Sequence, residues 1–171
     1  MLTPRENLLE TVRGGHPDRY VNQFEPFALQ WCTPIDVLYP LPEKGGEPKP
    51  GIWGATFAFP EGTPGVFPIH DEEHLVIKDI TRWKEYVKMP QTEFPEEDWG
   101  WIVEEANKVD RSKYFCTVFV GPGVFENCHH LMGIEACMLN LYEEPECMHE
   151  LIDYITEYEL KLAENICSHI H

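Results

Sequence analysis

The sequence predicts an α/β fold in which a buried strand leads through a glycine loop into a helix. Residues 115–120 (FCTVFV) are rich in β-branched and aromatic side chains without polar alternation, which is typical of a strand buried on both faces. The loop Gly121-Pro122-Gly123 ends this strand. The apolar residues that follow recur every three to four positions, as on a helix: Cys128, Leu131, Ile134, Met138 and Leu141. In parallel α/β folds, the loop of such a β-loop-α unit binds ligands, although it can equally be a tight turn.

The first elements are a helix and a strand. Thr3 to Glu6 forms a capping box, and with proline at the first helical position it predicts a helix from about Pro4 to Val12. Residues 27–32 (FALQWC) are expected to form the first strand of the parallel sheet. Gln30 and Trp31 would lie near the C-terminal end of that strand, where a ligand is expected.

A segment rich in proline and glycine follows, from about residue 36 to residue 68. Residues 52–59 alternate in a way that predicts a β-hairpin, with residues 37–39 as the pairing partner. An insertion of this length exceeds an ordinary loop and can serve as a lid or pocket wall. A structural excursion or a dimer contact is equally compatible with the sequence.

Four titratable side chains follow the insertion, between Pro68 and His74. His70 and Asp71 are candidates for acid/base chemistry or ligand orientation, because histidine titrates near neutral pH. The alternative is an exposed turn whose acids cap the next helix. The spacing of His70 and His74 also suits a metal, but no third ligand accompanies it.

Three helices are predicted in the remaining chain. A short one begins at Asp79 or Thr81 and runs to Lys88, and the next runs from Trp99 to Val109. The buried face of the second comprises Trp99, Ile102, Val103 and Ala106. The last helix begins at Pro145, and its apolar face comprises Met148, Leu151, Ile152, Ile155, Leu162, Ile166 and Ile170.

Two further candidates lie in the helix after the glycine loop. Glu126 is in the first turn, where its carboxylate would face a bound ligand or simply stabilise the helix dipole. His129 and His130 are adjacent, and neighbouring side chains on a helix diverge by about 100°, so both cannot easily bind one ion. One histidine is expected near the pocket, with the other packed or solvated.

The charge of the chain excludes several classes of partner. The 171 residues carry a net charge of -17, and 43% of them are hydrophobic, which predicts one domain with a real core. An acidic surface repels phosphate backbones and anionic membranes, so no nucleic-acid or membrane partner is expected.

Cysteine usage and hydropathy predict a cytoplasmic location. The six cysteines include no CxxC pair and fall mostly on apolar faces, as small core residues do in a reducing compartment. The first residues contain no apolar core of signal-peptide length, and no window approaches about eighteen uninterrupted apolar residues.

Several short motifs recur in an order that resembles a known family. The glycine loop is followed by LxGxE at residues 131–135, LYxxPE at residues 141–146 and ELxxxI at residues 150–155. This pattern resembles the uroporphyrinogen decarboxylase superfamily, which also includes cobamide-dependent methyltransferases that act on thiols. The G-x-P-D-R sequence at residues 15–19 resembles the methyltransferase-like branch more closely.

The resemblance implies a (β/α)₈ TIM barrel, which typically needs about 250 residues. We therefore expect this chain to be the N-terminal half of a single barrel domain over residues 1–171, with the hairpin inserted after its first strand at about 36–68. The family's zinc ligands would lie in the missing half, so no metal ligand is assigned. Zinc and a corrinoid are expected only for the complete barrel.

Methyl transfer between a corrinoid carrier, such as a corrinoid protein, and a small molecule would then occur at the barrel mouth. The expected catalytic residues are His70, Asp71 and Glu126. The expected substrate-binding residues are Gln30, Trp31, Gly121, Pro122, Gly123 and His129.

Two other functions stay open. Porphyrinogen decarboxylases carry an arginine-rich segment after the first strand, whereas residues 31–39 contain no arginine, and an acidic chain binds an octa-acid unfavourably. The other alternative is an inactive half-barrel that acts only through association. Because open strand edges are rarely left unpaired, we expect self-association or pairing with a C-terminal half.

Overall fold

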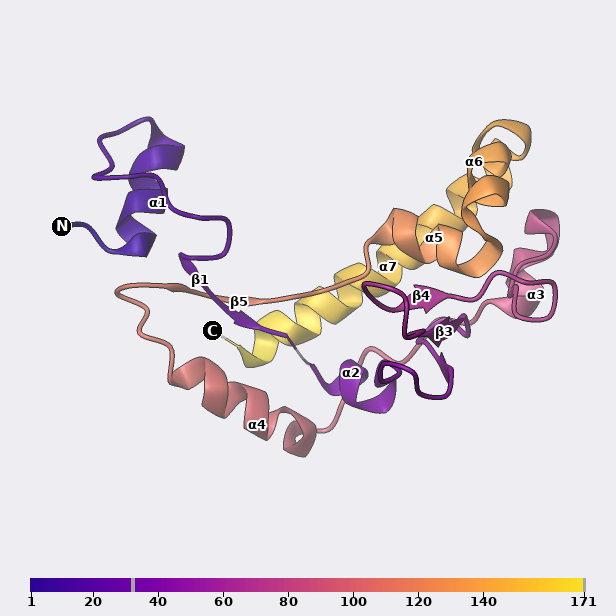
Figure 1. Cartoon of the computed structure of the whole chain (residues 1–171), viewed down its shortest axis with the longest axis horizontal. Helices are drawn as coiled ribbons and strands as arrows, with labels where there is room; N and C mark the ends of the chain where they lie inside the picture. The colour runs from indigo at the N-terminus through magenta and orange to yellow at the C-terminus, as the bar shows by residue number, and fades with distance from the viewer. Residues whose placement is uncertain (32, 171) are drawn as a thin grey trace. The chain divides into compact units, whose positions relative to one another are not determined.

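The computed structural model describes residues 1–31 and 33–170 and has a mixed α/β fold (Figure 1). The elements in chain order are α1 (Pro4–Arg13), β1 (Phe27–Gln30), α2 (Pro34–Leu38), β2 (Lys49–Pro50), β3 (Thr56–Ala58), β4 (Phe67–Pro68), the 3₁₀ turn η1 (Ile80–Arg82), α3 (Trp83–Tyr86), α4 (Glu96–Asn107), β5 (Phe115–Val118), α5 (Val124–Met132), α6 (Ile134–Glu143) and α7 (Pro145–His169).

The chain divides into two compact units. The first unit comprises Met1–Pro34, Phe94–Phe119 and the C-terminal residues from Ile166 onward. The second unit comprises Ile35–Glu93 and Val120–Asn165. The single barrel domain expected from the sequence stays a prediction.

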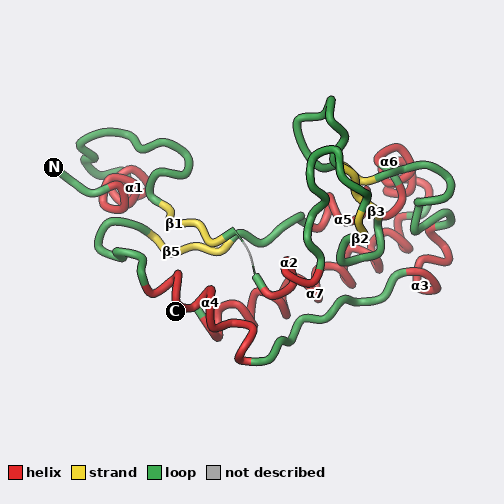
Figure 2. The backbone as a smooth tube through the Cα atoms, turned by 60° about the horizontal axis from the view of Figure 1, so that its bottom comes forward, coloured by secondary structure: helices red, strands yellow, loops and turns green. Residues whose placement is uncertain are grey.

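The first unit contains a parallel pair of strands. β1 pairs with β5 from Phe27 opposite Phe115 to Gln30 opposite Val118, and the two strands run side by side in Figure 2. The predicted strands are therefore confirmed, but both are shorter than expected. Every residue of β1 and β5 is only half-buried, so the expectation of burial on both faces is wrong. The reason is that, within the described residues, this sheet has two strands and each has an unpaired outer edge.

The predicted capping box of α1 is confirmed. The Thr3 hydroxyl accepts a hydrogen bond from the Glu6 amide at 3.2 Å, and the Glu6 carboxylate accepts one from the Thr3 amide at 2.8 Å. Asn7 is fully buried and donates to the Leu2 and Thr3 carbonyl oxygens at 3.1 and 3.2 Å. The side-chain oxygen of Asn7 accepts a hydrogen bond from the Arg19 amide at 3.2 Å. These contacts fasten the segment after α1 to the start of the helix.

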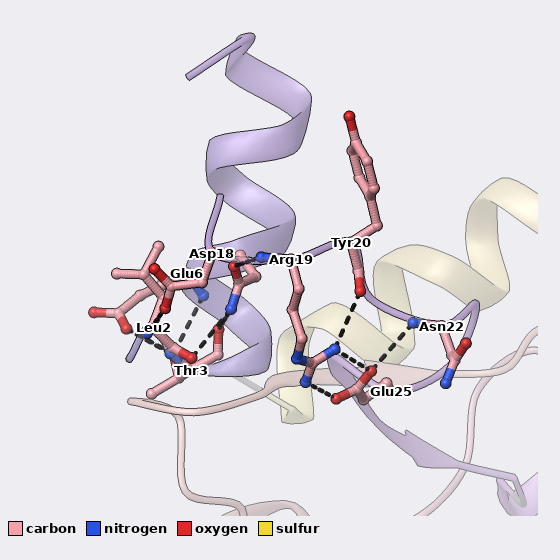
Figure 3. A network of polar contacts seen from close by, with 9 residues as sticks. Leu2, Thr3, Glu6, Asp18, Arg19, Tyr20, Asn22 and Glu25 are labelled. Carbon is pink, nitrogen blue, oxygen red and sulfur yellow. Dashed lines mark hydrogen bonds and ion pairs between the residues drawn. The ribbon is translucent and has the colours of Figure 1, made fainter. Parts of the chain in front are cut away.

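The residues of the G-x-P-D-R sequence have structural partners (Figure 3). Asp18 accepts a hydrogen bond from the Leu2 amide, and Arg19 forms a two-pronged ion pair with Glu25. The Arg19 guanidinium lowers the pKa of Glu25 to about 2, because it stabilises the carboxylate. The Asn22 amide also donates to Glu25 at 3.1 Å. In this chain the motif shapes the loop that leads into β1.

The buried face of α4 agrees with the sequence prediction. Trp99, Ile102 and Ala106 are buried, and Val103 is half-buried. The Trp99 ring stacks on the imidazole of His169, with ring centroids 4.3 Å apart and an interplanar angle of 8°. The helix begins three residues earlier than expected, at Glu96, and its first turn carries three acids that favour the dipole.

The second unit contains an antiparallel sheet in the order β2-β3-β4. The predicted pairing of the hairpin with residues 37–39 is wrong, because residues 34–38 form α2, with proline at the first helical position and an acid in the first turn. β3 pairs instead with β2 and β4. A tight turn allows β2 to pair with β3. In this turn Gly54 has a φ of +89°, and the Gly51 amide donates to the Ala55 carbonyl at 2.7 Å.

The core of the second unit is built on α7, whose predicted start at Pro145 is confirmed. Trp53 packs edge-on against Tyr158 of α7, with ring centroids 5.0 Å apart, and Trp83 packs against Tyr154 at 5.3 Å. The buried apolar side chains of this unit include Trp53, Ala55, Ile77, Ile80, Trp83, Val87, Cys128, Leu131, Met132, Cys137, Met148, Leu151, Ile155, Tyr158 and Leu162.

The single helix expected after the glycine loop is interrupted. α5 ends at Met132 and α6 begins at Ile134, because Gly133 has a φ of +83° and a ψ of 151°, which no helix accommodates. The Gly133 amide donates to the His129 carbonyl at 2.8 Å, and its carbonyl accepts from Cys137 at 3.0 Å. Periodicity could not reveal the break, since the apolar positions continue across it.

The five described cysteines are free thiols, as expected; Cys32 lies outside the described residues. Cys128 and Cys137 are buried, and burial raises the pKa of Cys128 to about 12, as expected for a core thiol. Within residues 1–31 and 33–170, no helix has the length and apolar character needed to cross a membrane.

Candidate functional site

The glycine loop links β5 to α5, and Gly123 is the N-cap of the helix. The Asn127 amide donates to the Gly123 carbonyl at 2.9 Å, which closes the first turn. Glu126 turns its carboxylate back toward this terminus, since a methyl group added to Gly123 would lie 3.0 Å from Glu126 Oε2. A carboxylate at this position stabilises the helix dipole, and it also lies beside the loop that is expected to face a ligand.

A buried asparagine ties the loop to α7. Asn127 is 3% exposed, and its side-chain nitrogen donates to the Pro122 carbonyl at 3.0 Å and to Glu159 Oε1 at 3.2 Å. Burial raises the pKa of Glu159, the hydrogen bond from Asn127 opposes this increase, and the nearby charge of Glu126 adds to it. The loop is therefore connected to a carboxyl group that is harder to ionise than an ordinary glutamate.

Three histidines lie close together: His70, and His129 and His130 of α5. The rings of His70 and His129 are 6.5 Å apart, and those of His129 and His130 are 4.6 Å apart. His70 Nε2 lies 3.3 Å from the His130 carbonyl oxygen. Phe57 packs edge-on against His130 at 5.2 Å, and Phe125 packs against His129 at 5.5 Å. Burial, followed by the charges of His129 and His70, lowers the pKa of His130 to about 4.

The stability of the protein is expected to fall as His130 is driven to protonate. The pKa of His130 is about 4 in the folded chain and near 6.5 in an unfolded one, so between these values the unfolded state binds more protons. The contribution of His130 is therefore fully present above about pH 6.5 and is lost as the pH falls toward 4. Thermal unfolding of wild type and His130→Gln across this range measures the effect.

The expected result is a wild-type Tm that declines more steeply with falling pH than that of His130→Gln. His16→Gln is the matched control, because His16 is exposed and should leave the wild-type profile unchanged. Parallel profiles for wild type and His130→Gln would contradict the prediction.

Asp71 pairs with His74. Asp71 Oδ1 accepts hydrogen bonds from the His74 backbone amide at 2.9 Å and from His74 Nδ1 at 2.6 Å, and His74 lowers the pKa of Asp71. A carboxylate in this position orients an imidazole for proton transfer. Both side chains remain partly exposed. Of the two neighbours selected from the sequence, His70 belongs to the histidine group and Asp71 to this pair.

Gln30 and Trp31 belong to the first unit, whereas the other candidates belong to the second. The Gln30 carbonyl accepts a hydrogen bond from the Phe119 amide at 2.9 Å, which extends the parallel pairing beyond β1. The Trp31 side chain is 61% exposed, and its ring packs against Phe119 with centroids 5.2 Å apart. The rings of Phe24 and Trp31 pack in a T-shaped arrangement with centroids 6.5 Å apart. These aromatic rings form an exposed group at the C-terminal ends of the strands.

Asn127 and Glu159 are not among the site residues predicted from the sequence. Asn127 lies four residues before the buried Leu131, and Glu159 lies four residues after the buried Ile155, so both border apolar helix faces. A polar side chain that is buried on such a face must find a hydrogen-bond partner, but the spacing does not identify that partner. Within residues 1–31 and 33–170, no group of three or more histidine, cysteine, aspartate or glutamate side chains is arranged to hold a metal ion.

Comparison with known proteins identifies no relative: no family model, no curated protein and no solved structure matches the chain. The likeness to the uroporphyrinogen decarboxylase superfamily rests on the short motifs alone. It therefore stays a prediction.

Proposed function

We propose that this chain forms the N-terminal part of a TIM-barrel enzyme resembling the uroporphyrinogen decarboxylase superfamily, and that the complete barrel transfers methyl groups between a corrinoid carrier and a small molecule. The observation that carries the proposal is the parallel pairing of β1 with β5, which leads into the glycine loop. In (β/α)₈ barrels the active site lies at the carboxyl ends of parallel strands. The motif order along the sequence supports the same assignment.

The parallel pair also explains why further strands are needed. Parallel sheets are normally covered on both faces and paired on both edges. Among the described residues, β1 and β5 have only each other as partners, and all eight of their residues are half-buried. The proposal therefore includes a partner that supplies strands, either a second copy of this chain or a C-terminal half.

The exposed aromatic rings at the strand ends suit a flat apolar ligand. Trp31 is 61% exposed and Phe119 is 51% exposed, and together they offer apolar surface against which a corrinoid would pack. A bound corrinoid would supply the methyl group from its cobalt. The zinc ligands of the family would lie in the second half of the barrel, so zinc is proposed only for the complete barrel and no step of the proposal uses it.

Charge favours methyl transfer over decarboxylation. The chain has a net charge of -17, and residues 31–39 contain no arginine to receive the carboxylates of a porphyrinogen. The free thiols of the five described cysteines suit a reducing compartment, so the proposal places the protein in the cytoplasm. Neither a nucleic-acid partner nor a membrane partner is proposed for the protein.

The need for a strand-supplying partner is tested by light scattering and calorimetry on this chain. We expect association, or unfolding without a sharp transition. A monodisperse monomer that unfolds cooperatively would overturn the half-barrel proposal.

The chemistry is tested on the assembled form, with a C-terminal half added where a longer reading frame supplies one. Methylcobalamin and a small thiol are mixed with the protein, and loss of the cobalt-bound methyl group is followed by absorbance. Uroporphyrinogen is assayed in parallel for decarboxylation. Methyl transfer without decarboxylation is the expected result, and the reverse would establish the decarboxylase alternative. Assembly without either activity would favour a half-barrel that acts only through association.

A further inference from the structure

The geometry points to Glu159 as a positioning residue that holds the Gly121-Pro122-Gly123 loop through the side chain of Asn127. This inference rests on the proposed function in one respect, because the loop matters for catalysis only if it faces the substrate. The contacts themselves do not depend on that function. All of the residues concerned belong to the second unit.

Asn127 is the central member of the connection. Its side-chain nitrogen has two N–H groups, and the two acceptors are the Pro122 carbonyl at 3.0 Å and Glu159 Oε1 at 3.2 Å. Because Asn127 is 3% exposed, water cannot easily replace either partner. The loop carbonyl is therefore held at one point, by a group whose orientation Glu159 fixes.

The ionisation state of Glu159 sets how firmly Asn127 is held. A carboxylate accepts a hydrogen bond more strongly than a neutral acid does. Glu126 of α5 and Tyr158 of α7 are the titratable groups whose charges interact with Glu159. Burial and Glu126 both favour the protonated form, so acidification is expected to loosen Asn127 and, with it, the loop.

Hydrogen exchange in the first turn of α5 reports on the loop. The Asn127 amide donates to the Gly123 carbonyl, so its exchange measures whether Gly123 stays in place. Mass-spectrometric detection of the peptide containing the loop and this turn works for monomers and assemblies alike. We expect exchange to be roughly tenfold faster in Glu159→Ala, because the Asn127 side chain loses its charged hydrogen-bond acceptor.

Two variants separate positioning from general stability. Glu157→Ala is the matched control, because Glu157 lies on the same helix, is exposed, and pairs with Lys161 at 2.6 Å. Its loop exchange should equal that of wild type. Glu159→Gln keeps an oxygen acceptor but cannot ionise, so at neutral pH its loop exchange should lie between that of wild type and that of Glu159→Ala, and it should show no change with pH beyond the intrinsic one.

The pH series completes the test and remains usable if Glu159→Ala does not fold. The ratio of wild-type to Glu159→Gln exchange, measured from about pH 4 to pH 7, cancels the intrinsic pH effect on exchange. We expect the wild-type loop to lose protection at the acidic end. A ratio that is constant with pH, or equal exchange in Glu159→Ala and Glu157→Ala, would overturn the inference. Failure of the methyl-transfer assay alone would leave it intact.

Discussion

Replacement of Trp99 by alanine is expected to destabilise the first unit by about 3–5 kcal/mol. Trp99 is 1% exposed, and its ring contacts the edge-on ring of Phe94, with centroids 6.3 Å apart, and the stacked imidazole of His169, with centroids 4.3 Å apart. Truncation would remove the ring contacts with both neighbours and leave a cavity in the core of this unit. Urea unfolding followed by far-ultraviolet circular dichroism measures the loss.

Trp101→Ala is the matched control for this prediction. It removes the same side chain from the same helix, but Trp101 is 42% exposed, so the expected loss is below about 0.5–1 kcal/mol. Comparable losses for the two variants would mean that the α4 face is assigned wrongly. A loss confined to one of two unfolding transitions would identify the first unit as a separately folding part.

Local patterns in the sequence are sufficient to predict elements whose partners do not need to be known. The capping box at Thr3 and the face of α4 follow from spacing alone, and both are confirmed. The pairing of β3 could not be predicted in this way. Its partners, Lys49–Pro50 and Phe67–Pro68, are two-residue strands that contain proline and carry no alternation. The pairing of Lys49–Pro50 with β3 depends on the turn at Gly54, not on the composition of the strand.

The candidate site illustrates the same limit. The motif order located the glycine loop, and helix position located Glu126 and His129. The connection between Asn127 and Glu159 spans 32 residues, so no local pattern could reveal it. The pairing of Asp71 with His74 spans three residues and could have been considered, since an aspartate commonly bonds to groups two or three residues later.

Substitution of Gly133 by alanine is expected to destabilise the second unit by about 1–3 kcal/mol. Gly133 has a φ of +83° and a ψ of 151°, a backbone conformation that is essentially restricted to glycine. The nearest atoms to an added methyl group would be His70 Cγ and Leu75 Cδ2, both at 3.9 Å, which is ordinary contact. The cost therefore arises from the backbone rather than from crowding.

The strain would act on the junction of α5 and α6, because Gly133 ends one helix and begins the other. The carbonyl of Leu131, two residues before Gly133, accepts hydrogen bonds from the Val76 and Ile77 amides at 3.1 and 2.9 Å. A shift of the backbone at Gly133 would therefore also loosen the segment that carries His74. Gly100→Ala is the control: nothing lies within 4 Å of its added methyl group, and alanine should stabilise the α4 interior by about 0.5–1 kcal/mol. Chemical denaturation should thus change in opposite directions for the two variants. Equal stability of Gly133→Ala and wild type would show that α5 and α6 can join as the continuous helix predicted from periodicity.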